Sequence, residues 1–86
     1  MTLIPGKLYR LLPIARHRDG KSYCFIYVEG DYVPGMGRIF CKTILADRLV
    51  MLVDSNIRQC PNGLELVTIL VDEMTCWIVP YHLLNP

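Results

Sequence analysis

Apolar positions recur along this chain with the two-residue period of β-strands, and no segment shows the 3.6-residue stripe of a helix of ordinary length. In residues 21–28, three aromatic side chains fall on one face, and a cysteine and two aliphatic side chains fall on the other. The apolar runs are short and rich in β-branched and aromatic residues. We expect strands at residues 6–12, 21–28, 37–44, 48–53, 64–71 and 75–79.

Turn-forming residues separate these runs. The connection Asp72-Glu73 is so short that it permits only an antiparallel hairpin between its two strands. Because it lacks glycine, we expect a four-residue type I loop, since a two-residue type I′ turn would force positive φ angles on both acids. Short strands at this spacing predict an all-β fold, a small barrel or sandwich. The other turns are expected at Asp19-Gly20, Glu29-Gly30-Asp31, Pro34-Gly35 with Gly37, and Pro61-Asn62-Gly63.

The C-terminal part of the chain has the most characteristic order of features. An acidic turn follows an apolar strand, Trp77 lies on the next strand, and PYHLL at residues 80–84 is expected to include one 3-10 turn. This order resembles the end of the small SH3-like barrels found in bacteria and tailed phages. PGKLYRLL at residues 5–12 is similar to the first strand of such barrels. The resemblance implies one SH3-like β-barrel domain over residues 1–86, with five to six short antiparallel strands and a 3-10 segment near the C-terminus.

One segment departs from the SH3 pattern. In peptide-binding SH3 domains, the loop after the first strand is long, acidic and aromatic. Here the corresponding segment, PIARHRDGKS at residues 13–22, is short, basic and free of aromatic residues. We therefore do not expect a groove for proline-rich peptides.

The length of 86 residues fits one domain, and 52% of the residues are hydrophobic. That content supplies a dense core or leaves apolar surface for a partner. No apolar run approaches the ~18 residues of a membrane helix, and the first ten residues lack the order of a secretory signal. We expect a small soluble protein of the cytoplasm with no membrane contact.

Four cysteines are separated by 17, 19 and 16 residues, with no C-x-x-C pair. Structural zinc sites usually draw their ligands from closely spaced pairs, and disulfides belong to oxidising compartments, for which no secretory signal argues. In a strand, a free cysteine behaves as a small hydrophobe. We therefore expect no metal, no cofactor and no disulfide, and buried thiols at Cys24, Cys41, Cys60 and Cys76.

The predicted strand at residues 21–28 offers the first candidate binding surface. An aromatic row in an alternating strand either packs in the core or at the rim of the barrel, or it forms a platform for a partner, and these interpretations stay open here. The glycine-rich connection at residues 30–37 adds two exposed, adaptable side chains. Trp77, which has apolar neighbours, is expected to be buried and structural. The candidate residues for a protein partner are Tyr23, Phe25, Tyr27, Tyr32 and Met36.

A basic cluster at residues 16–21 is the second candidate. Residues 1–48 contain eight Lys or Arg and four Asp or Glu, a net charge of +4, whereas residues 49–86 contain one and four, a net charge of −3. A basic hairpin tip can contact nucleic-acid phosphates, but this cluster has no interleaved aromatic residues and the whole chain carries only +1. A solvated hairpin tip and a site for an acidic protein are the other interpretations. The candidate nucleic-acid residues are Arg10, Arg16, Arg18 and Lys21.

The sequence contains no pattern of catalytic residues. His17 and His82 lie in a basic loop and in the tail, and Ser22 and Ser55 lack a nucleophile-elbow motif. We expect a non-enzymatic protein-interaction module that uses a barrel face or an exposed edge strand, or that associates with itself. The resemblance implies a phage-encoded setting, as a virion component or a host-factor binder. The alternative is a nucleic-acid or ribosome-associated barrel that uses the basic loop at residues 16–21.

Overall fold

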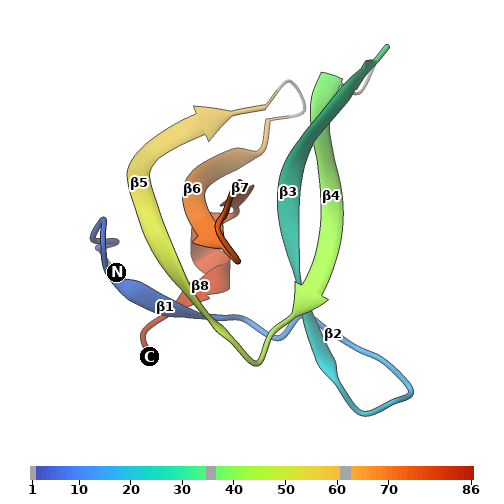
Figure 1. Ribbon diagram of the computed structural model, residues 1–86, viewed down its shortest axis with the longest axis vertical. Coiled ribbons are helices and arrows are strands. Elements are labelled where there is room, and N and C mark those ends of the chain that lie inside the picture. The colour runs from blue at the N-terminus through green and yellow to red at the C-terminus, as the bar shows by residue number, and fades with distance from the viewer. Residues whose placement is uncertain (1, 35–36, 61–62) are drawn as a thin grey trace.

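The computed structural model describes residues 2–34, 37–60 and 63–86 and shows an all-β chain (Figure 1). Within these residues, one 3-10 turn, η1 (Pro80–His82), precedes the last strand. None of the described residues forms a helix long and apolar enough to cross a membrane. The strands in this part of the chain are β1 (Leu8–Leu11), β2 (Ala15–Arg16), β3 (Ser22–Val33), β4 (Gly37–Leu45), β5 (Leu49–Gln59), β6 (Glu65–Val71), β7 (Met74–Ile78) and β8 (Leu83–Leu84).

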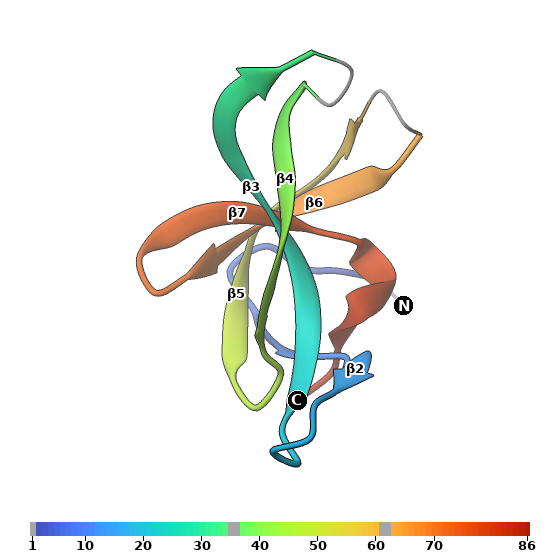
Figure 2. The ribbon, with the colours of Figure 1, turned by 90° about the vertical axis from the view of Figure 1, so that its right-hand side faces the viewer.

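The strands form one curled antiparallel sheet, in the order β2-β3-β7-β6-β5-β1-β8, and β4 pairs with β3 outside this path. In Figure 1 the sheet curves through β5 and β6 on one side, and the β3–β4 hairpin stands on the other. β3 meets β7 at one residue pair, Tyr27 with Trp77, where the two strands cross steeply (Figure 2). The arrangement is a half-closed barrel in which the β3–β4 hairpin folds over the remaining strands.

The inner face of the curl holds the core, which is mainly aliphatic. Alternate residues of β5, β6 and β7 point inward, as a strand with one buried face requires. β8 closes the end of the core by pairing Leu83 with Leu11 of β1. The clustered core residues are Tyr9, Leu11, Cys24, Ile26, Val50, Leu52, Val67, Ile69, Val71, Cys76, Ile78 and Leu83.

The described part of the chain contains eight strands, so the expected count of five to six is wrong. Two strands of two residues each, β2 and β8, are too short to produce an alternating pattern. β5 continues past the expected end at residue 53 with register shifts around Asp54, where the run of polar residues hides the strand. All six expected strands are present, with different ends.

The segment Glu29-Gly30-Asp31 lies within β3, although we expected a turn there. Gly30 serves packing rather than a turn, because a Cβ at this position would lie 2.8 Å from the ring of Phe40 on β4. The ladder between β3 and β4 is regular up to Glu29 and shifts register beyond it. The hairpin end of β3 and β4 therefore reaches further than the sequence indicated.

The turn between β6 and β7 is a two-residue turn, and our expectation of a four-residue loop is wrong. Val71 pairs with Met74, and both residues between them have positive φ angles, 48° at Asp72 and 65° at Glu73. These are the angles of a type I′ turn, whose twist matches that of the flanking strands. Arg48 donates to the Asp72 carboxylate and forms an ion pair with it, and this contact holds the first turn residue in place.

Replacing Glu73 with glycine should stabilise the protein by about 1 kcal/mol, because glycine adopts the positive φ angle without the steric penalty of a Cβ. A change of that size raises the melting temperature of a domain this small by roughly 4–8 °C. Glu65→Gly, at an exposed position of β6, is the control and should be destabilising. Thermal unfolding followed by circular dichroism checks both. A lower melting temperature for Glu73→Gly would contradict the type I′ geometry.

Candidate functional site

The aromatic residues of β3 lie on the outward face of the sheet. Cys24 and Ile26 are fully buried in the core, so the alternate residues Tyr23, Phe25 and Tyr27 point the other way, and all three are half-buried. The structure places these rings outside the clustered core residues, a position that fits both packing at the barrel rim and a platform for a partner. The aliphatic side chains fill the interior, and the larger aromatic rings lie on the surface beside it.

Trp77 lies on the same outward face. Its neighbours on β7, Cys76 and Ile78, are fully buried, so the indole points away from the core, where it is half-buried. Its strand position is paired with Tyr27 of β3. Trp77 is mostly buried, as expected, but it lies outside the clustered core residues. The alternation of Cys76 and Ile78 around it was the signal in the sequence that could have placed it correctly.

We call Tyr23, Phe25, Tyr27 and Trp77 the outward aromatic row. Both ends of the row carry a polar side chain that contacts a ring. The ring of His17 meets Tyr23 edge-on with centroids 4.3 Å apart, and the guanidinium carbon of Arg58 lies 4.6 Å from the centroid of the Trp77 ring, which is a cation–π geometry. We did not expect Arg58 at this site, because it lies in the extension of β5 beyond residue 53.

The hydroxyl of Tyr27 lies in a partly enclosed environment. Burial raises the pKa of Tyr27, and the neighbouring Cys41 and Cys60 thiols raise it further. Cys41 is the β4 partner of Tyr27 in the ladder, so both side chains point to the outward face. The Tyr27 hydroxyl is thus a neutral hydrogen-bonding group in the row, as are the Tyr23 hydroxyl and the Trp77 indole N–H.

The other candidate residues for a protein partner lie outside the row. Tyr32, near the end of β3, is 64% exposed. Met36 falls outside the described residues. Tyr32 is therefore an accessible aromatic side chain on the projecting β3–β4 hairpin, whereas the row lies on the body of the sheet.

The basic candidates are divided between two places. Arg16, Arg18 and Lys21 are all exposed around the tight connection from β2 to β3, where the Lys21 N–H donates to the Asp19 carboxylate at 2.9 Å. Arg10 lies on β1 instead, and its Nε donates to the Asn85 carbonyl oxygen at 3.1 Å. The structure thus places three of the four on one hairpin tip, next to the His17 end of the outward aromatic row.

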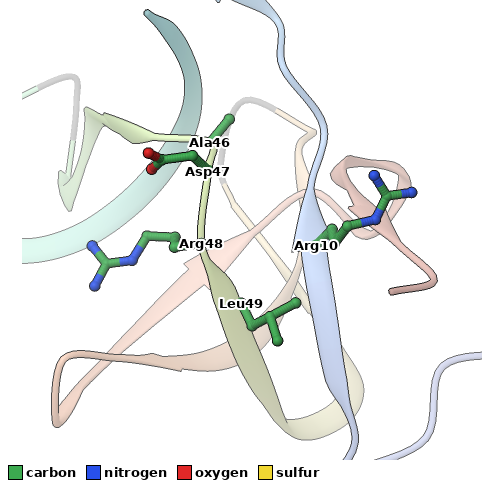
Figure 3. Close-up of a pocket in the computed structure, with 5 residues that line it drawn as sticks. All are labelled: Arg10, Ala46, Asp47, Arg48 and Leu49. Carbon is green, nitrogen blue, oxygen red and sulfur yellow. The ribbon is translucent and has the colours of Figure 1, made fainter.

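A shallow hollow lies between β1 and the β4–β5 turn, with a volume of about 290 Å³. Figure 3 shows that its two arginines point in different directions. Arg48 is engaged with Asp72, and Arg10 with the backbone of Asn85. The charged groups do not converge on a common point, so this hollow does not form an anion site. The lining residues are Arg10, Ala46, Asp47, Arg48 and Leu49.

The four cysteines differ in exposure, so the expectation of four buried thiols is wrong. Cys24 and Cys76 are buried, Cys60 is half-buried, and Cys41 is exposed. All four are free thiols, and the described residues contain no group of three or more potential metal ligands. Cys41 is exposed because it lies in the middle of β4, which has a strand on one side only.

In the folded protein, a thiol reagent such as DTNB should modify Cys41 rapidly and Cys60 more slowly. Cys24 and Cys76 should react only on unfolding, because burial raises the pKa of both thiols, that of Cys76 to about 11, and the thiolate is the reactive form. Time-resolved absorbance at pH 8 measures the phases. Cys41→Ser should remove the fast phase, and a fast phase that survives this substitution would contradict the assignment.

We predict that the protein loses stability in mild acid because the His82 ring is partly buried. Its Nδ1 is buried with no hydrogen-bond partner in the described part of the chain, and burial lowers the pKa of His82 below 6.5. The unfolded chain therefore binds more protons than the folded one as the pH falls through 6.5, and the free energy of unfolding decreases. Urea unfolding at pH 7 and pH 5 measures this change. His82→Gln should reduce this loss of stability between pH 7 and pH 5. An equal loss in His82→Gln and in the unmodified protein would contradict the interpretation.

Comparisons with known proteins identify no relatives of this chain. No protein-family model matches it, and neither curated proteins nor solved structures give a match. The functional argument therefore rests on the geometry described above.

Proposed function

We propose that this chain is a non-enzymatic protein-interaction module that binds its partner through the outward aromatic row. The observation that carries the proposal is the position of four half-buried aromatic side chains outside the clustered core residues. Tyrosine, tryptophan and arginine are the residues that most often supply the binding energy of protein interfaces. The row contains two tyrosines, one tryptophan and one phenylalanine, and the Arg58 guanidinium lies at its Trp77 end.

The architecture that we propose for this module is an SH3-like barrel. The order of its last elements supports this assignment: β6 and β7 are joined by a tight turn, η1 follows, and β8 returns to pair with β1. On this proposal, β3, β4 and their flanks form one long excursion between the first two barrel strands, β1 and β5, which pair with each other. A virion component or host-factor binder of a phage is the setting that the sequence resemblance implies.

The chemistry of the row favours a protein partner over nucleic acid. The polar groups of the row are the Tyr23 and Tyr27 hydroxyls and the Trp77 indole N–H. Its cations lie at the two ends, Arg58 beside Trp77 and the basic tip beside His17. Nucleic-acid sites need several cations along the path of the phosphates, and the net charge of the chain is only +1. A base-stacking role that uses Arg16, Arg18 and Lys21 is the alternative that the experiment must separate.

Affinity capture of the tagged chain from its native lysate, with and without nuclease, tests the proposal. We expect a protein that remains bound after nuclease treatment and that is retained when the salt concentration is raised from 50 to 200 mM. Phosphate-mediated binding would weaken by orders of magnitude over that range. Loss of all bound material on nuclease treatment would support the nucleic-acid alternative, and a doubled mass with no other bound protein would indicate self-association.

A further inference from the structure

The outer edge of β4 is a second surface that is open to a partner, because no strand of the described chain pairs with it. β4 pairs with β3 and with no other strand of the described chain. At its centre three consecutive residues, Cys41, Lys42 and Thr43, are all exposed. Successive side chains point to opposite faces of a strand, so both faces of β4 are open at this point, as well as its edge.

This edge is long and regular. Seven consecutive residue pairs join β3 and β4, from Tyr23 with Leu45 to Glu29 with Ile39, before the register shifts. In an antiparallel pair, every second residue of the outer strand points its N–H and C=O groups away from its neighbour. β4 therefore presents a row of backbone donors and acceptors that can template another strand. Neither proline nor a bulge interrupts this stretch of β4.

The charges on β4 are all positive. Its sequence GRIFCKTIL contains Arg38 and Lys42 and no acidic residue. Both side chains are exposed, and neither forms an ion pair within the described residues. They lie four residues apart, so they share one face of the strand, with Phe40 between them, at a spacing of about 13 Å along the strand.

We propose that an acidic strand of a protein partner pairs with the free edge of β4. This inference rests on the proposed function, because it identifies the chemistry of the partner that the module binds. The strand that fits has carboxylates four residues apart, opposite Arg38 and Lys42, and an apolar residue midway between them, opposite Phe40. Backbone hydrogen bonds bind it, and the two charge pairs fix its register.

A second copy of this chain fits the edge less well than an acidic strand. Two β4 strands paired edge to edge would bring four cations onto adjacent strands, and like charges on neighbouring strands are destabilising. Lysine and arginine on an exposed edge are a known protection against such self-pairing. The same charges attract carboxylates, so they discriminate between the two occupants.

The added strand would also reach the outward aromatic row. The side chains of the added strand that do not face Arg38 and Lys42 point to the other face of the sheet. There they would lie beside Ile39, Cys41 and Thr43, on the face where Cys41 adjoins Tyr27. Neighbouring strands are about 4.8 Å apart, so this part of the partner lies roughly 10 Å from β3. One partner can therefore occupy the edge of β4 and contact the row.

A synthetic peptide tests this pairing directly. The probe is an eight-residue extended peptide with blocked ends, glutamates at its third and seventh positions and valine at its fifth. The control peptide has the same composition with glutamates at its third and sixth positions, which places them on opposite faces. We expect the probe to slow hydrogen exchange at alternate amides of residues 38–44. It should bind roughly threefold more tightly than the control, which loses one of the two charge pairs.

Variants of the protein supply the second arm of the experiment. Arg38→Glu combined with Lys42→Glu should weaken probe binding about tenfold. Lys7→Glu combined with Arg10→Glu changes the net charge equally at exposed positions in and just before β1, which does not pair with β3 or β4, and should leave binding almost unchanged. Circular dichroism checks that both variants fold, and the exchange measurement on the unmodified chain requires no variant.

Three results would overturn the inference. They are equal binding of the two peptides, protection of amides outside β4, and protection of β4 in the free protein together with a dimeric mass in sedimentation. The last result would identify a second copy as the occupant.

If the natural partner is lost on Tyr27→Ala but not on the Arg38 and Lys42 double substitution, the edge inference fails and the proposed function stands. If neither change affects capture, both fail.

Discussion

Replacing Ile26 with alanine should lower the free energy of unfolding by about 2–5 kcal/mol. Ile26 is fully buried in the core, and truncation would leave a cavity between β3 and the strands beneath it. Domains of this kind have a total stability of roughly 5–15 kcal/mol, so the variant should unfold at a much lower temperature or fail to fold. Urea unfolding followed by circular dichroism measures the difference.

Phe25→Ala is the matched control, since Phe25 is the neighbouring residue on the opposite, outward face of β3. A half-buried ring loses less on truncation, and we expect a decrease of about 1–2 kcal/mol. The order of the two effects is diagnostic, because shifting a strand by one residue exchanges its two faces. A larger loss for Phe25→Ala than for Ile26→Ala would show that β3 presents its aromatic face to the core.

Trp77→Ala should weaken binding of the protein partner by about 2 kcal/mol or more, which is roughly thirtyfold. Trp77 lies at the crossing of β3 and β7, between the Tyr27 and Arg58 side chains. It combines the largest ring of the outward aromatic row with the cation–π contact at its end. We expect the free energy of unfolding to fall by only about 1–2 kcal/mol, since the indole is outside the core. Titration calorimetry with the captured partner measures the affinity.

Ile78→Ala provides the comparison on the same strand. Ile78 is fully buried, so this substitution should lower stability by about 2–5 kcal/mol and leave the affinity of the folded protein unchanged. If Trp77→Ala unfolds the protein as severely as Ile78→Ala does, the indole is part of the structural framework. If Trp77→Ala binds the partner normally, the row is not the interface.

The sequence predicted which segments form strands, because alternation persists wherever one face is buried. It predicted strand ends poorly. Gly30 indicated a turn, yet it lies within β3 to make room for the Phe40 ring. The polar residues after position 53 indicated a loop, yet β5 continues through them to Gln59. In both cases a contact with the next strand of the hairpin overrides the local preference, and such contacts are not visible from one segment.

The candidate site was predicted only in part, for a related reason. A period of two shows that Tyr23, Phe25 and Tyr27 share a face, but it does not show which face meets the core. That choice depends on the inner faces of β5, β6 and β7, which are aliphatic and accept Ile26. Arg58 contacts the Trp77 ring although β6 separates their strands, β5 and β7, in the sheet. The turn at Asp72-Glu73 was missed because residue preference argued against positive φ angles, whereas the two-residue connection between paired strands requires them.

Hydroxyl-radical footprinting of the chain, free and bound to its captured partner, tests the central claim most directly. The proposed interface predicts that oxidation of Tyr23, Phe25, Tyr27 and Trp77 decreases in the complex. Tyr81, which is 87% exposed on η1, should be oxidised equally in both states and serves as the internal reference. Unchanged oxidation of the four row residues, with new protection at Tyr81 or at the β2–β3 tip, would contradict the claim.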